Sequence, residues 1–188
     1  MKCLRGLGIV VAVVFLTGVG QANADTIFDT SFSGTYIGGQ GTLDATVNGN
    51  GSYTVVSGSL TVTDTNANVP LANDVFTVYA APNPGVNTSP DGSFYYDNLL
   101  FSSQPYLDDT AGLLFTDAKG NELNIWGPGY NNDPLYAAWI STPSQWWASQ
   151  DNNVVFNATD PPSVPEPATL LLLGSGVAGL VGWRWRRK

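Results

Sequence analysis

NGNGSYTVVSGSLTVTD, residues 48–64, decides the fold class of this chain. It begins with Asn48-Gly49-Asn50-Gly51, and Asn-Gly readily takes the positive φ angles of a tight β-hairpin turn. After a break at Ser57-Gly58, Leu60 and Val62 alternate with serine and threonine, which is the period of a strand with one apolar face. The stretch therefore predicts a hairpin turn followed by two strands, residues 52–57 and 59–64.

The same signals recur from residue 25 to residue 159. Runs rich in Thr, Val, Tyr and Phe alternate with clusters of Gly, Asn, Asp and Pro, and no helical period lasts long enough to predict a helix. The other predicted strands are residues 27–37, 41–47, 75–79, 93–102, 112–116, 122–126, 136–141 and 154–158. Many short strands joined by short turns favour an all-β fold. We predict one antiparallel β-sandwich over residues 25–159, with a β-barrel as the alternative.

The charge of this middle region is strongly one-sided. Residues 25–163 hold 14 of the 15 acidic residues, and Lys119 is their only positive residue. Such an acidic surface repels phosphate backbones, so nucleic acid is excluded as a partner. The region also contains no cysteine and no histidine, which rules out a disulfide, a thiolate nucleophile, a histidine base and thiolate or imidazole metal ligands.

Residues 1–24 have the pattern of a cleaved secretory signal peptide. Lys2 and Arg5 provide the positive start, residues 7–19 the apolar centre, and Ala22 and Ala24 an A-x-A cleavage site. We therefore expect the mature chain to begin near Asp25 and to work outside the cytoplasm.

The C-terminal sequence predicts a spacer, a transmembrane helix and a positively charged end that stops the helix in the membrane. Residues 160–167 are rich in proline, which favours an extended, exposed backbone. Residues 168–184 are apolar up to a terminal arginine and predict one transmembrane helix, and residues 185–188 form a basic cytoplasmic end. The cluster that stops the helix in the membrane consists of Arg184, Arg186, Arg187 and Lys188.

The order Val164-Pro165-Glu166-Pro167, apolar helix and basic end resembles the PEP-CTERM sorting signal of exported Gram-negative bacterial proteins. The resemblance implies recognition and cleavage near Pro165-Glu166-Pro167 by an exosortase-type transpeptidase. It also implies association with exopolysaccharide or cell-surface glycans. Residues 95–101, 107–115 and 122–129 resemble a pattern found in exported proteins that carry this tail, and that pattern implies no established activity.

Tryptophans and tyrosines crowd the C-terminal third of the middle domain. Aromatic side chains with exposed faces offer flat apolar contact to sugar rings, whereas in most β domains such residues fill the core. In a strand, Trp146 and Trp147 face opposite ways, so we expect one of them to be exposed. The predicted carbohydrate contacts are Trp146, Trp147, Trp126 and Tyr130, with Trp139 and Tyr136 nearby in the sequence.

Two acidic patterns raise the questions of catalysis and of calcium. Paired carboxylates are the machinery of glycoside hydrolysis, and the candidates are Asp97, Asp108, Asp109, Asp117 and Glu122. Acids near turns also promote solubility and turn formation, so we predict no catalytic residue and no cofactor. Asp64-Thr65-Asn66-Ala67-Asn68 opens like a calcium loop, but Val69 and Val75 replace the required glycine and glutamate. An ordinary turn is expected there, and calcium on scattered Asp oxygens stays open.

The sequence thus favours a non-enzymatic, exported β domain. We expect it to cross the inner membrane, stay anchored before sorting, and then reach the cell surface or extracellular matrix. The alternatives are a carbohydrate-binding module that uses exposed Trp and Tyr, and a carboxylate-dependent hydrolase.

Overall fold

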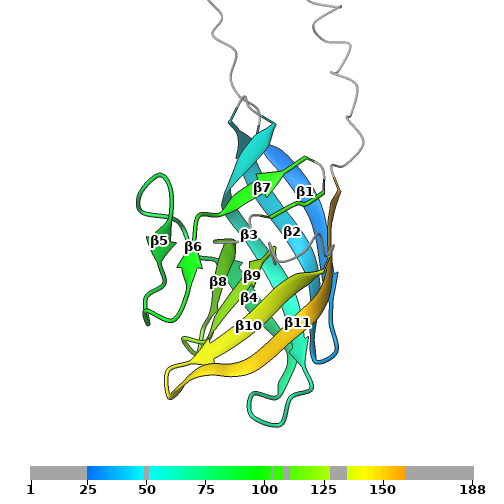
Figure 1. The fold of residues 1–188 in the computed structure, drawn as a ribbon, viewed down its shortest axis with the longest axis vertical. Coiled ribbons are helices and arrows are strands. Elements are labelled where there is room, and N and C mark those ends of the chain that lie inside the picture. The colour runs from blue at the N-terminus through cyan, green and yellow to red at the C-terminus, as the bar shows by residue number, and fades with distance from the viewer. Residues whose placement is uncertain (1–24, 49–50, 103, 108–110, 128–134, 160–188) are drawn as a thin grey trace, which may run out of the picture.

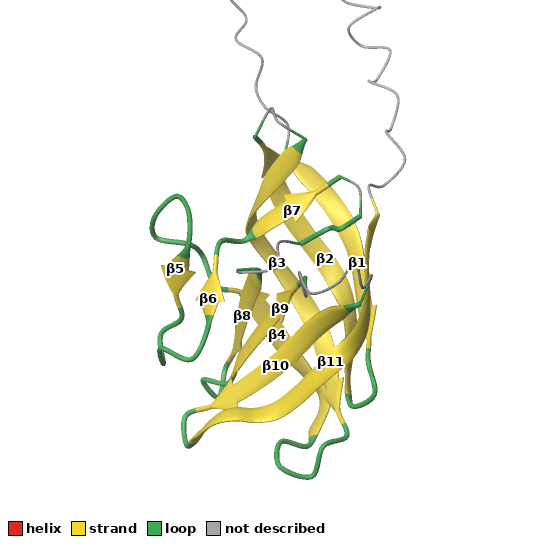
Figure 2. Cartoon of the chain, viewed as in Figure 1, coloured by secondary structure: helices red, strands yellow, loops and turns green. Residues whose placement is uncertain are grey.

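The computed structural model describes residues 25–48, 51–102, 104–107, 111–127 and 135–159. Eight strands form a closed antiparallel ring (Figures 1 and 2). They are β1 (Thr26–Ser33), β2 (Ile37–Val47), β3 (Ser52–Asp64), β4 (Leu71–Val78), β8 (Leu113–Asp117), β9 (Glu122–Trp126), β10 (Tyr136–Thr142) and β11 (Gln145–Thr159). Each strand pairs with the next along the chain, and β11 returns to pair with β1, so the fold is an up-and-down β-barrel.

The preference for a sandwich was wrong, and the alternative, a barrel, is the observed fold. The deciding element is β11, whose 15 residues reach both of its neighbours. Its first part pairs with β10 through Gln150↔Trp139, and its last part pairs with β1 through Phe156↔Phe32. This pairing of last and first strands removes the open edges that a sandwich would leave.

Residues 48–64 comprise the connection and the second strand of the β2–β3 hairpin. The expected hairpin is confirmed, because Val47 pairs with Tyr53 and the Asn48 amide donates to the Ser52 carbonyl at 2.9 Å. Gly49 and Asn50 of the predicted turn lie outside the described residues. The predicted break at Ser57-Gly58 is not a strand end. The strand β3 runs straight through it with a bulge, and Gly58, at a φ of 147°, lets the β2 backbone approach closely.

Other predicted boundaries also shift. The expected strand 27–37 ends at Ser33, and a turn leads into β2. The expected strand 93–102 splits into β6 (Tyr95–Tyr96) and β7 (Leu99–Phe101), because Asn98 between them has a φ of 54°. The expected strand 154–158 is the end of the much longer β11.

The barrel interior is filled with apolar side chains. Alternate residues along the strands point inward, as the period of a β-strand requires. The largest fully buried ones include Phe76, Phe115, Phe156, Ile37, Leu43, Leu60, Leu113 and Leu123. Each such side chain contributes about 1.5–3 kcal/mol through burial, so this core holds the ring closed without a covalent link.

Between β4 and β8 the chain leaves the ring and covers part of its outer surface. A small hairpin made of β5 (Asn87–Thr88), β6 and the loop 89–94 lies beside β8 (Figure 1). We call these residues, 87–96, the outer hairpin. Phe94 and Tyr96 of the outer hairpin pack with Leu114 of β8 and with Trp139 of β10 in a second apolar cluster.

Asn98 fastens this excursion to the barrel. Its Nδ2 donates to the Tyr79 carbonyl at 2.8 Å, and its Oδ1 accepts the Leu114 amide at 3.0 Å. Its own carbonyl accepts the Val55 amide at 2.8 Å. Asn98 is fully buried, so its polar groups need partners. These bonds take the place of the sheet hydrogen bonds that an irregular segment cannot form.

Within the described part of the chain, no helix has the length and apolar character needed to span a bilayer. The predicted signal peptide (1–24), spacer (160–167), transmembrane helix (168–184) and basic end (185–188) lie outside the described residues.

Candidate functional site

Three neighbouring strands place tryptophans on the outer wall of the barrel. Trp139 stands between the inward-facing Ala138 and Ile140 of β10, so its side chain points outward. The rings of Trp126 on β9 and Trp139 have centroids 5.1 Å apart, and those of Trp139 and Trp147 on β11 are 5.8 Å apart. Residues distant in sequence are thus gathered into one aromatic cluster by the strand pairing.

A bulge at the start of β11 turns two adjacent tryptophans to the surface. Residues 146–148 face Ser141 alone, and the Trp147 amide donates to the Ser141 Oγ at 3.0 Å. Trp147 has a φ of 51°, a left-handed conformation that costs an L-residue about 1–2 kcal/mol. As a result Trp146 and Trp147 are 59% and 45% exposed, with ring centroids 6.5 Å apart. Strand alternation alone had predicted one of the two at the surface.

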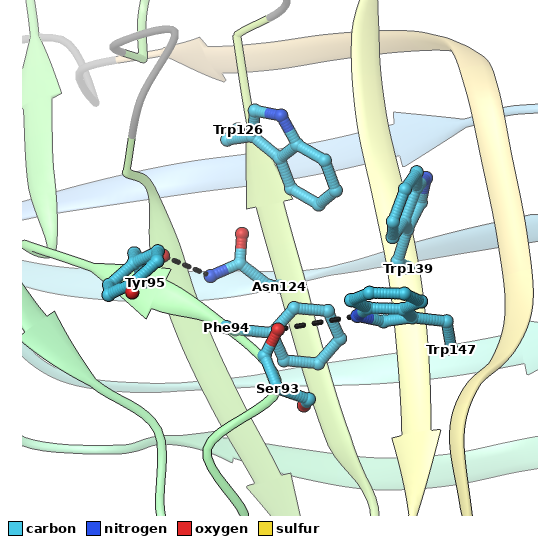
Figure 3. Close-up of a pocket in the computed structure, with 7 residues that line it drawn as sticks. All are labelled: Ser93, Phe94, Tyr95, Asn124, Trp126, Trp139 and Trp147. Carbon is cyan, nitrogen blue, oxygen red and sulfur yellow. Dashed lines mark hydrogen bonds between the residues drawn. The ribbon is translucent and has the colours of Figure 1, made fainter.

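The outer hairpin provides the opposite wall of a pocket. The Trp147 Nε1 donates to the Ser93 carbonyl at 3.3 Å, and the Asn124 Nδ2 donates to the Tyr95 carbonyl at 3.0 Å. Between these contacts lies a pocket of about 170 Å³, shown in Figure 3. Its lining consists of Ser93, Phe94, Tyr95, Asn124, Trp126, Trp139 and Trp147.

One side-chain amide accompanies the rings. Because Asn124 uses its Nδ2 on Tyr95, its amide oxygen points away from Tyr95, toward Trp126 (Figure 3). The Ser93 Oγ is buried near the Asp91 carboxyl and makes no hydrogen bond of good geometry within the described residues. The lining given above contains no charged side chain. The pocket can therefore contact an apolar ring face while it hydrogen-bonds to neutral groups.

A pair of carboxyl groups ties the outer hairpin to β9 beside the pocket. Glu122 is 3% exposed, and its Oε1 accepts the Asp91 amide at 3.1 Å. Its Oε2 is buried with no hydrogen-bond partner that meets the geometry in the described part of the chain. Burial, reinforced by the Asp91 carboxyl, raises the pKa of Glu122 to about 7.

The Asp91 carboxyl has the opposite balance. Burial alone would raise its pKa, but hydrogen bonds from Glu122, Ser93 and Ser89 outweigh burial and lower the pKa overall. Its Oδ1 accepts the Ser89 Oγ at 2.9 Å and the Ser93 amide at 2.7 Å. Below about pH 7 a proton therefore resides on Glu122 while Asp91 is ionised. Asp91 also shapes the loop that carries Ser93.

The structure gathers part of the predicted carbohydrate site. Trp126 and Trp147 line the pocket, and Trp146 touches the ring of Trp147. Tyr130 lies outside the described residues. The site residues that sequence reasoning did not select are Ser93, Phe94, Tyr95, Asn124 and Trp139.

The sequence did contain a signal that Asn124 lies beside Trp126. In Glu-Leu-Asn-Ile-Trp, residues 122–126, the inward Leu123 and Ile125 place Asn124 and Trp126 together on the outer face. The contribution of the outer hairpin had no such local signal, because it depends on contacts across more than 25 residues of chain.

The described acids that were considered for catalysis make hydrogen bonds to nearby backbone amides. Asp97 accepts the Leu99 amide at 3.0 Å, and Asp117 accepts the amides of Lys119 and Asn121 in the β8–β9 turn. Asp108 and Asp109 lie outside the described residues. Asp64 accepts the Asn66 amide at 2.7 Å in a local turn. No group of three His, Cys, Asp or Glu residues suited to a metal ion occurs in the described segments.

Comparison with known proteins identifies one segment of the chain. A model of the PEP-CTERM protein-sorting motif matches residues 163–188, which include Pro165-Glu166-Pro167 and the basic cluster. The motif indicates an exported protein that is processed by an exosortase and sorted to the cell envelope. No curated protein and no solved structure matches the chain.

Proposed function

We propose that this chain is a non-enzymatic carbohydrate-binding protein, displayed at the cell envelope by its sorting motif. The motif at residues 163–188 supports the destination. The aromatic pocket on the outer wall of the barrel supports the activity. The two features are compatible, because the envelope is rich in polysaccharide and aromatic faces suit contact with a sugar ring.

One observation carries the proposal, namely the convergence of Trp126, Trp139 and Trp147 around a pocket that also offers a neutral amide. The C–H faces of a sugar ring pack on aromatic faces, and its hydroxyl groups bond to side-chain amides and hydroxyls. The volume of about 170 Å³ is below the roughly 300–1,000 Å³ of sites for drug-sized molecules. It therefore suits one sugar unit.

The strained backbone of Trp147 also supports a binding role for the pocket. Trp147 adopts a left-handed φ that glycine or asparagine would adopt at lower cost. Strain of this kind is commonly retained where a side chain has a task at the surface. Here it brings the Trp147 ring into the pocket wall.

The geometry favours binding over hydrolysis. Glycoside hydrolases hold two carboxyl groups about 5–9.5 Å apart across the scissile bond. The Asp91 and Glu122 carboxyl groups instead influence each other's pKa directly, and neither lines the pocket. Their arrangement supports a structural role beside the site.

The route to the envelope is the second half of the proposal. Residues 168–184 anchor the exported chain in the inner membrane of a Gram-negative cell, with the basic end in the cytoplasm. An exosortase then cuts near Pro165-Glu166-Pro167, and the domain is retained among exopolysaccharide or surface glycans. In cells with an active exosortase, Glu166→Ala should leave a membrane-bound protein that keeps its basic end, as measured by fractionation and mass spectrometry. Unchanged processing of this variant would contradict the role of the motif.

The binding test uses the mature protein and a panel of soluble polysaccharides in affinity gel electrophoresis and calorimetry. Trp147→Ala should weaken binding about 10-fold or more, because central aromatic contacts typically contribute about 2 kcal/mol. Tyr36→Ala is the matched control, since Tyr36 is an exposed aromatic residue outside the pocket. Equal binding by the two variants, or no binding by the unmodified protein, would refute the proposal.

A further inference from the structure

We infer that the pocket accepts one uncharged sugar unit of a soluble, flexible glycan chain, and that it excludes uronic-acid polymers and the flat faces of insoluble polysaccharides. This inference rests on the proposed carbohydrate binding and specifies its substrate class. Three independent observations carry it: the angles between the rings, the orientation of one amide, and the distribution of charge.

The tryptophan rings do not form a flat platform. The planes of Trp126 and Trp139 are inclined by 75°, and those of Trp139 and Trp147 by 68°. The planes of Trp146 and Trp147 are inclined by 52°. A flat polysaccharide surface can stack on several rings at once only when those rings are coplanar. Rings arranged edge to face form a concave surface instead. Such a surface can enclose one sugar unit that projects from the rest of its glycan chain.

The side chain of Asn124 offers a ligand only a hydrogen-bond acceptor. Its Nδ2 is committed to the Tyr95 carbonyl, and this bond fixes which end of the amide faces the pocket. The free end is the oxygen, which accepts and cannot donate. A sugar hydroxyl can donate to it, whereas an ionised carboxylate has only acceptor oxygens and would be repelled.

The charge of the domain opposes anionic ligands. Lys119 is the only positive residue between residues 25 and 163, against 14 acids. Its ammonium group is already bonded to Asp74 and lies outside the pocket lining. A uronic-acid chain would therefore meet a negative surface with no cation available in this region to offset its desolvation.

The test uses polysaccharides that share a backbone and differ in charge or solubility. The sets are hydroxyethylcellulose, carboxymethylcellulose and microcrystalline cellulose; soluble, carboxymethyl and granular starch; and methyl-esterified pectin with polygalacturonate. In the set whose backbone is recognised, the mature protein should bind the soluble uncharged member at least about 10-fold more tightly than its anionic partner. The insoluble member should retain little protein, and the soluble member should displace what it retains.

The outcomes separate this inference from the proposed function. Binding to none of the polymers overturns carbohydrate binding itself, and binding unaffected by Trp147→Ala overturns the pocket as its site. Binding that depends on Trp147 but favours the anionic or insoluble member overturns only the substrate class.

A charge-adding variant tests the electrostatic step. The Tyr95 side chain is 66% exposed at the pocket edge, while its backbone carbonyl makes the bond to Asn124. Tyr95→Arg should keep that bond and narrow the preference for the uncharged polymer by about 3-fold or more, with a smaller effect as salt rises. An unchanged preference in this variant would overturn the role given to charge.

Discussion

The two halves of the barrel wall treat their outer faces differently. On β1 the buried residues are Phe28, Thr30 and Phe32, and they alternate with the exposed Ile27, Asp29 and Ser31. On β9 four successive residues, 122–125, are all buried, although only two of them face the core. We call β1–β3 the bare half and β8–β10 the covered half, because the outer hairpin lies over the latter.

The difference shows which part of the barrel wall packs against a second segment. The strands of the bare half bury only one face, so apolar and polar residues simply alternate along their sequences. The covered half has a second, outer interface, and polar residues such as Asn98, Asn124 and Glu122 are buried there with partners from other segments. The aromatic pocket lies at the margin of this interface, where the cover ends and the tryptophans meet solvent.

The largest expected effect comes from cutting the attachment of the cover. Asn98→Ala leaves the Leu114 amide and the Tyr79 carbonyl without these partners and places alanine at a left-handed φ. The free energy of unfolding should fall by about 4 kcal/mol in urea denaturation. Asn157→Ala on the exposed outer face of β11 is the matched control and should stay within about 0.5 kcal/mol of the unmodified protein. Similar losses in both variants would show that the cover contributes no special stability.

The second prediction concerns pH. The pKa of Glu122 rises from 4.5 to about 7 on folding, so between these values the folded state binds more protons than the unfolded state. Its contribution to the free energy of unfolding, up to about 3 kcal/mol, is present below pH 4.5 and lost as the pH rises through 7. The groups that face it are the Asp91 carboxyl and the hydroxyls of Ser89 and Tyr96. Thr116 and Ser141 pair with it on the neighbouring strands.

Glu122→Gln isolates this contribution, because glutamine resembles the protonated acid and can donate to Asp91. The variant should match the unmodified protein at low pH and become more stable than it above pH 7. Chemical denaturation across this range, followed by tryptophan fluorescence, measures the difference. A difference that stays constant with pH would contradict the raised pKa of Glu122.

A smaller effect is expected within the bare half. At Gly58 an added Cβ would lie 2.5 Å from the Thr42 carbonyl oxygen, and the φ of 147° disfavours any side chain. Gly58→Ala should therefore destabilise the barrel by about 2 kcal/mol. Gly51→Ala also has a positive φ, but its Cβ would meet open space, so a loss of about 1 kcal/mol is expected in thermal unfolding. Equal losses would mean that the close approach of β2 and β3 is unimportant.

The smallest effect is expected at the surface ion pair. The Lys119 side chain is 63% exposed and bonds to Asp74 across the barrel surface. Exposed pairs contribute little, because the solvent screens them and holding two side chains in place costs entropy. Lys119→Met should leave the unfolding temperature unchanged within the scatter of repeated measurements. A clear drop would indicate that this pair helps to hold the β8–β9 turn against β4.

The sequence predicted the local features of the fold and part of the site. The Asn-Gly hairpin, the all-β class and the β8–β9 turn follow from residues close together in the chain, so their signals are short-range. The crowding of Trp126, Trp139 and Trp147 was visible as well. The choice of sandwich failed because alternation gives a strand one buried face and does not say which distant strand will pair with it.

What the sequence by itself determined is the destination and the building blocks. The sorting motif is read as a linear peptide, and the turns and alternating strands depend on neighbours within a few residues. Only the tertiary structure decided the rest. The pairing of β11 with β1 closed the barrel, the bulge at Trp147 turned its ring outward, and the outer hairpin completed the pocket. These outcomes depend on register and packing between segments far apart in the chain, and no local pattern encodes them.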